Sequence, residues 1–388
     1  MELPRLAILG GDTCFEVQGD GVRDYACRFG GALQETGRFD VDLFWRRTTG
    51  SWGCAHGDTT KYGGETSDPW RLLPGYAAVI LQYDMFRFDR RGFAPWLPYR
   101  LARLRRAAPG TRIAVMMHEL HSPFLGWKWR LKYGWQRVQQ FAMRLSTDVF
   151  FCAVEPWTEE LARKRPARPA LHLPVASNLP DRRHAREWER LRLGADRGTI
   201  VIAAFGTDAS AWRLLDYLVH AVNTVAQSGR KLVFLNLGGN TPKLSGIRDD
   251  VHVYQPGFLP AEAIAEAIAA TDIFLAPFAD GVSARRTTLM AAMQHGVAIV
   301  GTDGVYTDRL LREAHHALRL APMADPDAFA RQVLRLATNP DERLALGRGA
   351  RTLYEEQFDW PVIAARVATT LGRGELDPSS RAREVPAS

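Results

Sequence analysis

The sequence predicts an α/β protein made of two doubly wound parallel-sheet domains that face a central cleft. In both halves, short apolar runs such as residues 5–11 (RLAILGG) and 199–206 (TIVIAAFG) alternate with longer helical patterns. This order is typical of parallel sheets with helices on both faces. A polar segment rich in Pro and Arg, residues 166–198, separates the halves and indicates a domain boundary. With 388 residues, 46% of them hydrophobic, the chain is long enough for two cores.

The first half begins with the strand at residues 5–11, followed by a helix and a second strand. The next segment, residues 48–69, is rich in Gly, Thr and Ser, so we expect a long surface loop there. Strands and helices alternate after it. The expected strands are residues 39–46, 76–84, 112–120 and 148–154, and the expected helices are residues 21–37, 98–110 and 127–146.

The second half has the same architecture without a repeated sequence. Its further strands are expected at residues 231–239, 251–257, 273–278 and 297–304, with helices at 212–227 and 261–270 and a last helical stretch at 340–371. We therefore expect an N-terminal domain over residues 1–185 and a second domain over residues 199–355. A C-terminal helix, residues 356–372, is expected to pack back on domain one. The tail, residues 373–388, is polar and is expected to be disordered.

Composition limits the classes of function. The net charge is +7, but no basic stripe lies in a recognisable nucleic-acid-binding module, so nucleic acid is not an expected partner. A diphosphate ligand or an anionic membrane surface would suit this charge. The sequence has no apolar run of about 18 residues that would predict a membrane span. The absence of a signal-peptide pattern and the four scattered cysteines favour a cytoplasmic protein.

Residues 277–303 carry the strongest functional signal. An apolar strand leads into a Gly-containing loop, and two arginines, Arg285 and Arg286, stand with Thr287 and Thr288 at the start of a helix. A helix N-terminus favours anions, and arginine forms forked contacts with phosphate. A solvated arginine pair is the alternative, but the helix dipole disfavours cations at this end unless an anion binds there. The segment therefore predicts a phosphate site.

Two further segments contain candidate catalytic or metal-binding residues. His118 follows the apolar strand RIAVMM and lies beside Glu119, at the carboxyl end of the strand, where ligands of α/β sheets bind. A structural histidine is the alternative. Asp40 and Asp42 match a metal-binding DxD pattern, but they lie in an alternating strand that would turn both acids to solvent, so no metal site is predicted.

Four segments resemble the retaining GT-B glycosyltransferases of the group 1, family 4-like type, which include sucrose- and mannosyl-transferases. They are residues 19–33 (GDGVRDYACRFGGAL), 118–123 (HELHSP), 173–180 (LPVASNLP) and 281–303 (GVSARRTTLMAAMQHGVAIVGTD). The resemblance covers roughly residues 3–370 by pattern. It implies a GT-B fold of two Rossmann-like domains and a biosynthetic enzyme. Such an enzyme moves a sugar from a nucleoside-diphosphate sugar, GDP- or UDP-linked, to the hydroxyl or thiol of a small-molecule acceptor, with retention of configuration.

The resemblance and the pattern together give each candidate residue a role. His118 is the catalytic candidate, expected to orient sugar hydroxyls, because the leaving phosphate is thought to act as the base in this group. The expected diphosphate contacts are Gly19, Gly21, Arg213, Arg285, Arg286, Thr287 and Thr288; the sugar or base contacts are Ser283, Gly206 and Leu259; the acceptor contacts are Glu16 and Glu119. No metal and no cofactor other than the sugar nucleotide is expected.

The chain departs from this group at several positions. Ser283 and Ala291 stand where the group usually has two glutamates, and Thr207 and Arg213 stand at the places of its Arg and Lys pair. Two alternatives therefore stay open. A GT-B-shaped sugar-nucleotide epimerase would need acid–base carboxylates in the cleft. A non-catalytic sugar-nucleotide-binding partner subunit is favoured by the missing glutamates.

The predicted helix at residues 127–146 mixes tryptophans with cations. Its sequence interleaves Trp127, Trp129 and Trp135 with Arg130, Lys132 and Arg137. A basic, tryptophan-bearing helix can lie on an anionic membrane. We favour instead an amphipathic helix that packs its aromatic side chains on the sheet, so peripheral membrane contact is not the first expectation. The segment around residues 92–100 and the predicted loop at 48–69 are candidates for an acceptor pocket.

Overall fold

The computed structural model describes most of the chain. The described residues are 2–11, 21–47, 50–59, 61, 63–84, 86–89, 91–120, 127–164, 168–206, 213–239 and 244–372, with the backbone alone described at 21 and 127–131. The predicted tail at 373–388 lies outside them. Cys27, Cys54 and Cys152 are free thiols. No helix in these ranges is both long and apolar enough to cross a membrane.

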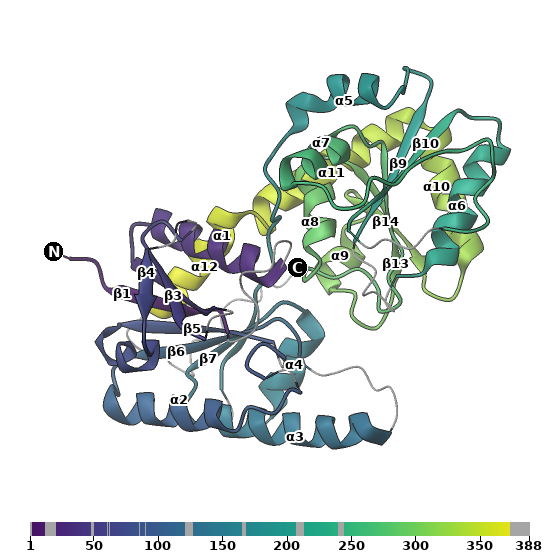
Figure 1. Cartoon of the computed structure of the whole chain (residues 1–388). Helices are drawn as coiled ribbons and strands as arrows, with labels where there is room; N and C mark the ends of the chain where they lie inside the picture. Colours follow the sequence, from purple (N-terminus) through teal and green to yellow (C-terminus); the bar gives the residue numbers. More distant parts are fainter. Residues whose placement is uncertain are drawn as a thin grey trace, which may run out of the picture.

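The first domain is built on an eight-stranded sheet with the order β4-β3-β2-β1-β5-β6-β7-β8. Its strands are β1 (Arg5–Leu9), β2 (Asp40–Arg46), β3 (Trp52–His56), β4 (Gly64–Thr66), β5 (Ala78–Tyr83), β6 (Arg112–Met117), β7 (Val149–Cys152) and β8 (Ala170–His172). Alternate residues of the central strands enter two different cores. Helices α1 (Gly21–Glu35) and α12 (Trp360–Gly372) cover one face, and α2 (Trp96–Ala107) and α3 (Trp127–Arg144) cover the other (Figure 1).

The expected loop at residues 48–69 is wrong. Strands β3 and β4 form there and extend the sheet antiparallel to β2. The added strands also bury Asp42, which is 2% exposed, so the expectation that both acids face solvent fails at this residue. Its carboxylate accepts hydrogen bonds from Arg5 Nη2 at 2.6 Å and Tyr76 Oη at 2.5 Å, and lies 2.5 Å from His56 Nδ1. Asp42 of β2 therefore links its strand to β1 through Arg5 and to β3 through His56.

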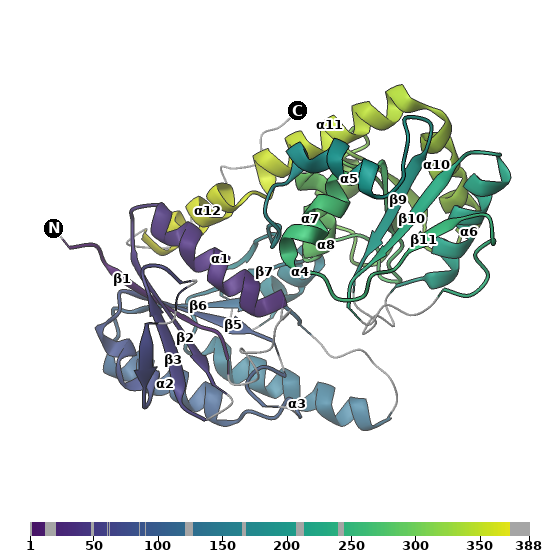
Figure 2. The ribbon, with the colours of Figure 1, turned by 45° about the horizontal axis from the view of Figure 1, so that its top comes forward.

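The second domain is built on a six-stranded, fully parallel sheet with the order β11-β10-β9-β12-β13-β14. Its strands are β9 (Ile200–Phe205), β10 (Leu232–Leu237), β11 (His252–Tyr254), β12 (Ile273–Ala276), β13 (Ala298–Asp303) and β14 (Leu318–Pro322). Helices α6 (Leu215–Gln227) and α10 (Pro326–Thr338) pack on one face. Helices α7 (Ala261–Ala269), α8 (Thr287–Gln294) and α11 (Pro340–Gln357) pack on the other (Figure 2).

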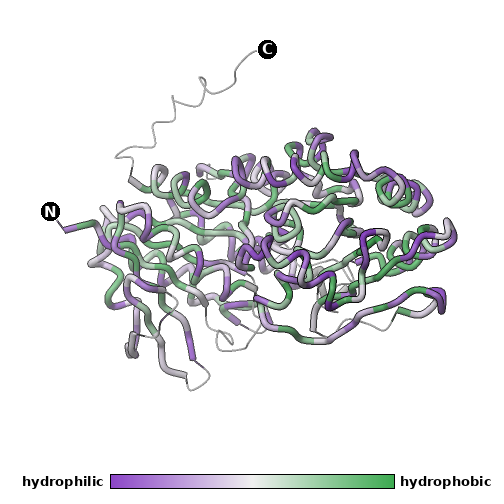
Figure 3. The backbone as a smooth tube through the Cα atoms, turned by 90° about the horizontal axis from the view of Figure 1, so that it is seen from above, coloured by the Kyte–Doolittle hydropathy of each residue, from purple (hydrophilic) through white to green (hydrophobic). Residues whose placement is uncertain are grey.

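Shorter helices lie between these elements. They are η1 (Pro69–Arg71), η2 (Leu73–Gly75), α4 (Glu155–Arg163), η3 (Arg183–Ala185), α5 (Arg186–Arg192) and α9 (Arg309–Glu313). The polar segment expected to be a boundary thus contains β8, which belongs to the first sheet, and α5, which contacts α7 of the second domain. In the view from above, helical segments alternate between hydrophilic and hydrophobic positions, as expected for helices with one buried face (Figure 3).

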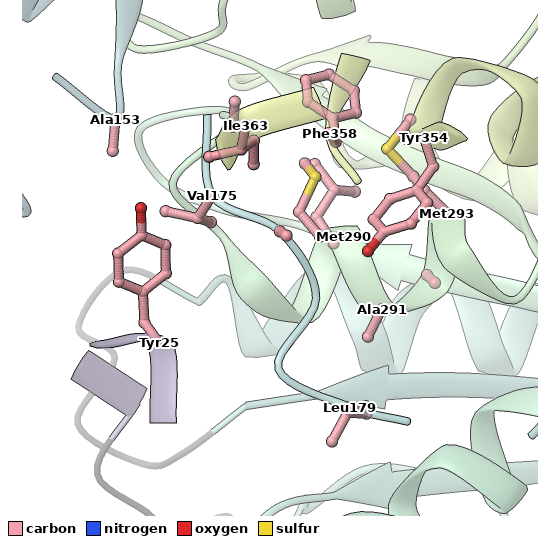
Figure 4. Close-up of a cluster of buried hydrophobic side chains, with 14 of the residues drawn as sticks. Tyr25, Ala153, Val175, Leu179, Met290, Ala291, Met293, Tyr354, Phe358 and Ile363 are labelled. Carbon is pink, nitrogen blue, oxygen red and sulfur yellow. The ribbon is translucent and has the colours of Figure 1, made fainter. Parts of the chain in front are cut away.

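The last helical stretch is two helices. α11 ends at Gln357 and α12 begins at Trp360, with Pro361 in its first turn, where the missing N–H breaks no helical hydrogen bond. α12 then packs against α1 of the first domain. Side chains from both domains meet around it, including Tyr25 of α1, Met290 of α8 and Ile363 of α12 (Figure 4). One hydrophobic core therefore continues across the domain junction.

A buried carboxylate strengthens the same junction. Asp308 of the second domain is 1% exposed and accepts hydrogen bonds from Glu155 N of the first domain at 2.8 Å and from Ala284 N at 2.5 Å. Burial raises the pKa of this carboxyl above its ordinary value. Val175 N also donates to Ala284 O at 2.8 Å. These contacts hold the loop before α8 against the first domain.

Candidate functional site

A cavity of about 260 Å³ lies between the two domains. Its lining residues in the described part of the chain are Val22, Tyr25, Asp84, Arg87, His118, Glu119, Ala153, Val175, Arg285, Arg286 and Thr287. The first-domain residues include those that follow β5, β6 and β7, and the second-domain residues stand at the start of α8. The cavity thus lies beyond the carboxyl ends of the strands, where open α/β sheets bind ligands.

A cationic pair forms the second-domain side of the cavity. Arg286 is the N-cap of α8, and Arg285 precedes it. Asp280, 2% exposed, accepts from both guanidinium groups: its Oδ1 lies 2.6 Å from Arg286 Nη2, and its Oδ2 pairs with Arg285 Nη2. The guanidinium of Arg286 also stacks over the ring of Phe278, 4.3 Å from the centroid. Burial, together with the charge of Arg285, lowers the pKa of Arg286.

The pair has a second carboxylate partner, from the opposite domain. Arg285 Nη1 donates to Glu119 Oε1 at 2.6 Å, and its guanidinium lies 5.1 Å from the ring centroid of Trp157. Contrary to the expectation, the two arginines at the start of α8 require no external anion, because Asp280 and Glu119 already neutralise them. The Glu119 side chain is 41% exposed, whereas that of Asp280 is 2% exposed. Removal of water by the cavity raises the pKa of Glu119.

His118 forms the first-domain side of the cavity. Its Nε2 lies 2.6 Å from Oε1 of Gln82, a fully buried side chain of β5. An amide oxygen can only accept, so Nε2 is the donor in this hydrogen bond. The edge of Tyr25 packs against the imidazole with centroids 5.1 Å apart, and Tyr25 in turn contacts Trp360 of α12 at 5.3 Å. These contacts hold the imidazole ring at the wall of the cavity.

Arg213 is a third cation at the same edge of the second sheet. It is 7% exposed, and its backbone bridges to Phe278, whose ring lies beneath Arg286. Its Nη2 donates to Asn236 Oδ1 at 3.1 Å, while Nη1 has no hydrogen-bond partner among the described residues. Burial lowers the pKa of Arg213 to about 10. A buried cation with an unsatisfied donor favours an anionic ligand nearby.

The remaining candidate residues differ in whether they line the cavity. Thr287 lines the cavity, whereas Thr288, Gly206 and Leu259 are not among its lining residues. Ser283 is completely buried, and its hydroxyl has no described partner. Gly21 is the first residue of α1. Gly19, Glu16 and Thr207 lie outside the described residues, so all these roles stay predictions.

Sequence reasoning missed three residues of the site. Asp280 could have been found, because it is an acid in the same loop as the arginines. Gln82 and Tyr25 gave no comparable signal, since both lie in apolar patterns that predict a core. None of the described residues of 48–69 and 92–100, the expected acceptor segments, lines the cavity. Within the described ranges, no group of three or more His, Cys, Asp or Glu side chains could hold a metal ion.

Comparison with protein families decides the class of the second domain. Residues 199–339 match the family described as Glycosyl transferases group 1. The second domain is a group 1 glycosyltransferase domain. The match contains Arg213, the β12–α8 loop and both arginines of the cavity. The expected resemblance and the expectation of a glycosyltransferase are thereby confirmed. A comparison with curated protein sequences gives no match.

Solved structures confirm the GT-B fold over nearly the whole chain. Sucrose-phosphate synthase from Thermosynechococcus elongatus is similar with a TM-score of 0.67 and 16% identity, covering 95% of this chain and 98% of that one. WaaG, a glycosyltransferase involved in lipopolysaccharide biosynthesis, has a TM-score of 0.62 and 14% identity, with coverages of 94% and 99%. Anabaena Alr3699/HepE, solved in complex with UDP and glucose, has a TM-score of 0.61 and 13% identity, with coverages of 95% and 99%.

Proposed function

We propose that this glycosyltransferase moves a sugar from a nucleoside-diphosphate sugar, UDP- or GDP-linked, to the hydroxyl or thiol of a small-molecule acceptor. We further propose that the configuration of the sugar is retained and that no metal or other cofactor takes part. One observation carries the proposal: Arg285 and Arg286 reach the cavity from the start of α8 and face His118 of the other domain. The structure of HepE with UDP-glucose supports a donor of this class.

The charge of the site decides how a diphosphate would bind. Arg285 and Arg286 supply two positive charges, and Asp280 and Glu119 supply two negative ones. A diphosphate must therefore replace one carboxylate. Glu119 is the one to leave, because its side chain is much more exposed than that of Asp280 and it makes a single ion pair, whereas Asp280 holds both arginines. The buried cation Arg213 and the N–H groups at the start of α8 would add to the attraction.

The reaction would use the two sides of the cavity differently. The bond between the anomeric carbon and the diphosphate oxygen breaks, and its electron pair goes to the phosphate, where the arginines stabilise the charge. The acceptor oxygen or sulfur forms the new bond on the same face of the sugar, and its proton passes to the released phosphate oxygen. His118, with Nε2 held by Gln82, would orient the sugar hydroxyls rather than take a proton.

A non-catalytic sugar-nucleotide-binding subunit is the second candidate. It is favoured by Ser283 and Ala291, both fully buried, at the positions where the resembled group has glutamates. The proposed enzyme and this subunit would both bind the nucleotide, so only turnover separates them. Incubation of the protein with donor alone, and with donor and mixed acceptors, followed by mass spectrometry, detects either hydrolysis or transfer.

Thermal unfolding with UDP, GDP, ADP and dTDP tests binding itself. A Kd of about 10 μM at about 1 mM ligand stabilises the protein by about 2.7 kcal/mol, which raises the melting temperature measurably. We expect a shift with UDP or GDP in the presence of EDTA. No shift with any of the four nucleotides would contradict the proposal, and a shift that requires Mg²⁺ or Mn²⁺ would contradict its metal-free form.

A further inference from the structure

The second feature of functional interest lies on the outer face of the first domain, away from the second domain. Helices α2 and α3 lie side by side there (Figures 1 and 2). Residues 90–147, which contain both helices, include twelve Lys and Arg residues and a single acid, Glu119. Glu119 lines the cavity between the domains. This part of the chain is therefore far more basic than the protein as a whole.

Helix α3 buries three glutamines together with Met143, and exposes several apolar side chains. Gln136, Gln139 and Gln140 are almost completely buried, whereas Val138, Phe141 and Leu145, which follows the helix, are each more than half exposed. This is the reverse of the usual surface helix, whose apolar stripe faces the core. The expected packing of the tryptophans on the sheet stays a prediction, because the side chains of Trp127 and Trp129 lie outside the described part and Trp135 is only partly buried.

The buried glutamines have a clear structural purpose. Gln139 donates to Tyr83 Oη at 3.0 Å and accepts from Ala94 N at 3.0 Å, and Gln140 donates to Leu120 O at 2.5 Å. They attach α3 to segments next to the cavity, because Leu120 follows Glu119 directly. Core packing thus accounts for the inner side of α3. It gives no account of the apolar outer side.

The outer apolar residues continue onto the segment before α2. Phe93 is 53% exposed, and its ring lies 4.3 Å from that of Trp135 on α3. We name Phe93, Tyr99, Val138, Phe141 and Leu145 the α2–α3 face. A hollow of about 360 Å³ borders it, lined by Val138, Phe141 and other residues of α3 and by Lys164 after α4. Surface patches of this kind mark binding sites.

Several arginines near the α2–α3 face have no carboxylate partner among the described residues. Arg100 and Arg105 form ion pairs with Asp68 and Asp148. In contrast, the exposed residues Arg91, Arg103, Arg106 and Arg137 form no ion pair with any carboxylate that the structure describes. Exposed apolar side chains among free arginines complement a surface that is anionic outside and apolar beneath.

We propose that the α2–α3 face binds the surface of an anionic lipid bilayer. Phe93, Phe141 and Leu145 would enter the interfacial region, and the arginines would contact lipid phosphates. A second copy of the chain fits less well, because two such faces would bring like charges together. The early part of α3 lies closer to the proposed donor cavity, since Lys132 lies 5.8 Å from the ring of Phe86, next to the cavity residue Arg87.

Flotation of the full-length protein with vesicles tests this proposal without any assay of transfer. We expect binding to phosphatidylcholine vesicles that contain phosphatidylglycerol and little binding to pure phosphatidylcholine. Binding should fall as NaCl rises from about 50 mM to about 500 mM, because salt screens the charges. Equal binding to both vesicles, or binding to neither, would overturn the proposal.

Matched variants locate the binding surface. The double variant Phe141→Ser/Leu145→Ser should weaken binding on the order of tenfold or more, whereas Leu191→Ser, a 77% exposed control on α5, should not. Arg103→Ser and Arg137→Ser should each weaken binding about fivefold, unlike the exposed control Arg331→Ser on α10. Circular dichroism checks folding. Equal losses in the controls, or light scattering that shows a dimer broken by the Phe141 variant, would overturn the membrane assignment.

Discussion

The two sides of the cavity are built on different physical principles. On the second-domain side, Arg285 and Arg286 are held by a buried carboxylate and by aromatic rings. On the first-domain side, which also carries Asp84, Arg87 and Glu119, His118 contacts the amide of Gln82 and the edge of Tyr25. A pair of arginines suits strong binding of an anion, and a histidine held by an amide and a ring suits the orientation of an uncharged sugar. We therefore expect substitutions on the second-domain side to change nucleotide affinity, and substitution of His118 to change turnover.

Asp280 is the residue on which the charged side depends most, and its replacement should have the largest effect. Asp280→Asn leaves two nearly buried guanidinium groups without their shared carboxylate. Loss of one partner of a buried ion pair costs about 3–5 kcal/mol. We expect that loss in the free energy of unfolding measured in urea. Asp327→Asn, whose side chain is 71% exposed, is the control and should change it little. A stable Asp280→Asn protein would show that the rings and Glu119 suffice.

Replacement of His118 tests the first-domain side of the cavity. His118→Ala should lower kcat about 10²-fold, equivalent to about 2.7 kcal/mol for one lost transition-state interaction. The affinity for UDP or GDP should stay almost unchanged, since His118 is proposed to contact the sugar and the proposed arginine contacts of the diphosphate lie in the other domain. His220→Ala, on α6 and outside the cavity, is the matched control. If kcat is unaffected, or if nucleotide affinity falls equally, the division between the two sides is wrong.

Much of this architecture could be predicted from the sequence. Short apolar runs predicted the parallel strands, and Arg285 and Arg286, the expected phosphate contacts, do line a cavity at the strand ends. The hairpin β3–β4 was missed because its short segment WGCAH lies among Gly and Thr residues typical of a loop. Strand β8 was missed because it is three residues long and flanked by prolines.

The partners of the site were harder to predict than its positions. Arg285 and Glu119 are 166 residues apart, and nothing local in either segment indicates that they meet. Glu119 was assigned to the acceptor from its position beside His118, but the structure gives it a cation as partner. The sequence also did not indicate that α3 would expose Val138 and Phe141 while it buries three glutamines. Periodicity shows that a helix has an apolar side, but only the tertiary structure shows which way that side faces.

The three cations should respond differently to loss of their charge. Arg285→Ala and Arg286→Ala should each weaken diphosphate binding by about 1.5–3 kcal/mol while binding of the parent nucleoside stays the same. Arg213→Gln should weaken diphosphate binding too. Its ligand-free stability should not fall, because a desolvated cation with one unsatisfied nitrogen is removed. Calorimetric titration with nucleoside and nucleoside diphosphate measures the first pair, and urea unfolding measures the last.

The outcome for these variants shows whether the arginines bind the diphosphate or only stabilise the fold. Arg285→Lys is the matched control, since it keeps the charge and loses the fork, and we expect an intermediate affinity. If nucleoside and diphosphate lose affinity equally, the arginines are structural and the phosphate assignment fails. If Arg213→Gln unfolds more easily than the parent protein, its hydrogen bond to Asn236 outweighs the cost of burying its charge.

Glu119 joins the two sides and gives the smallest and most specific effect. The proposed mechanism requires its carboxylate to leave Arg285 when the diphosphate binds, so Glu119→Gln should bind UDP or GDP several-fold more tightly, by about 1 kcal/mol for one exposed ion pair. The pKa of Glu119 is raised in the folded protein, because the cavity disfavours its ionised form. Ionisation therefore costs more in the folded than in the unfolded chain. The protonated carboxyl therefore stabilises the fold below the pKa that Glu119 has in the unfolded chain. This stability is lost as pH rises from that value through the raised pKa of the folded protein.

The same titration should appear in donor binding. As pH falls through the raised pKa of Glu119, the neutral carboxyl releases Arg285, and diphosphate affinity should rise relative to the Glu119→Gln variant, in which this contribution is already constant. Calorimetric titration of both proteins between about pH 4.5 and pH 7.5 measures the difference, because protonation of the nucleotide itself cancels between them. Parallel affinity profiles, or weaker binding by Glu119→Gln, would show that Glu119 supports the donor site rather than competing with its ligand.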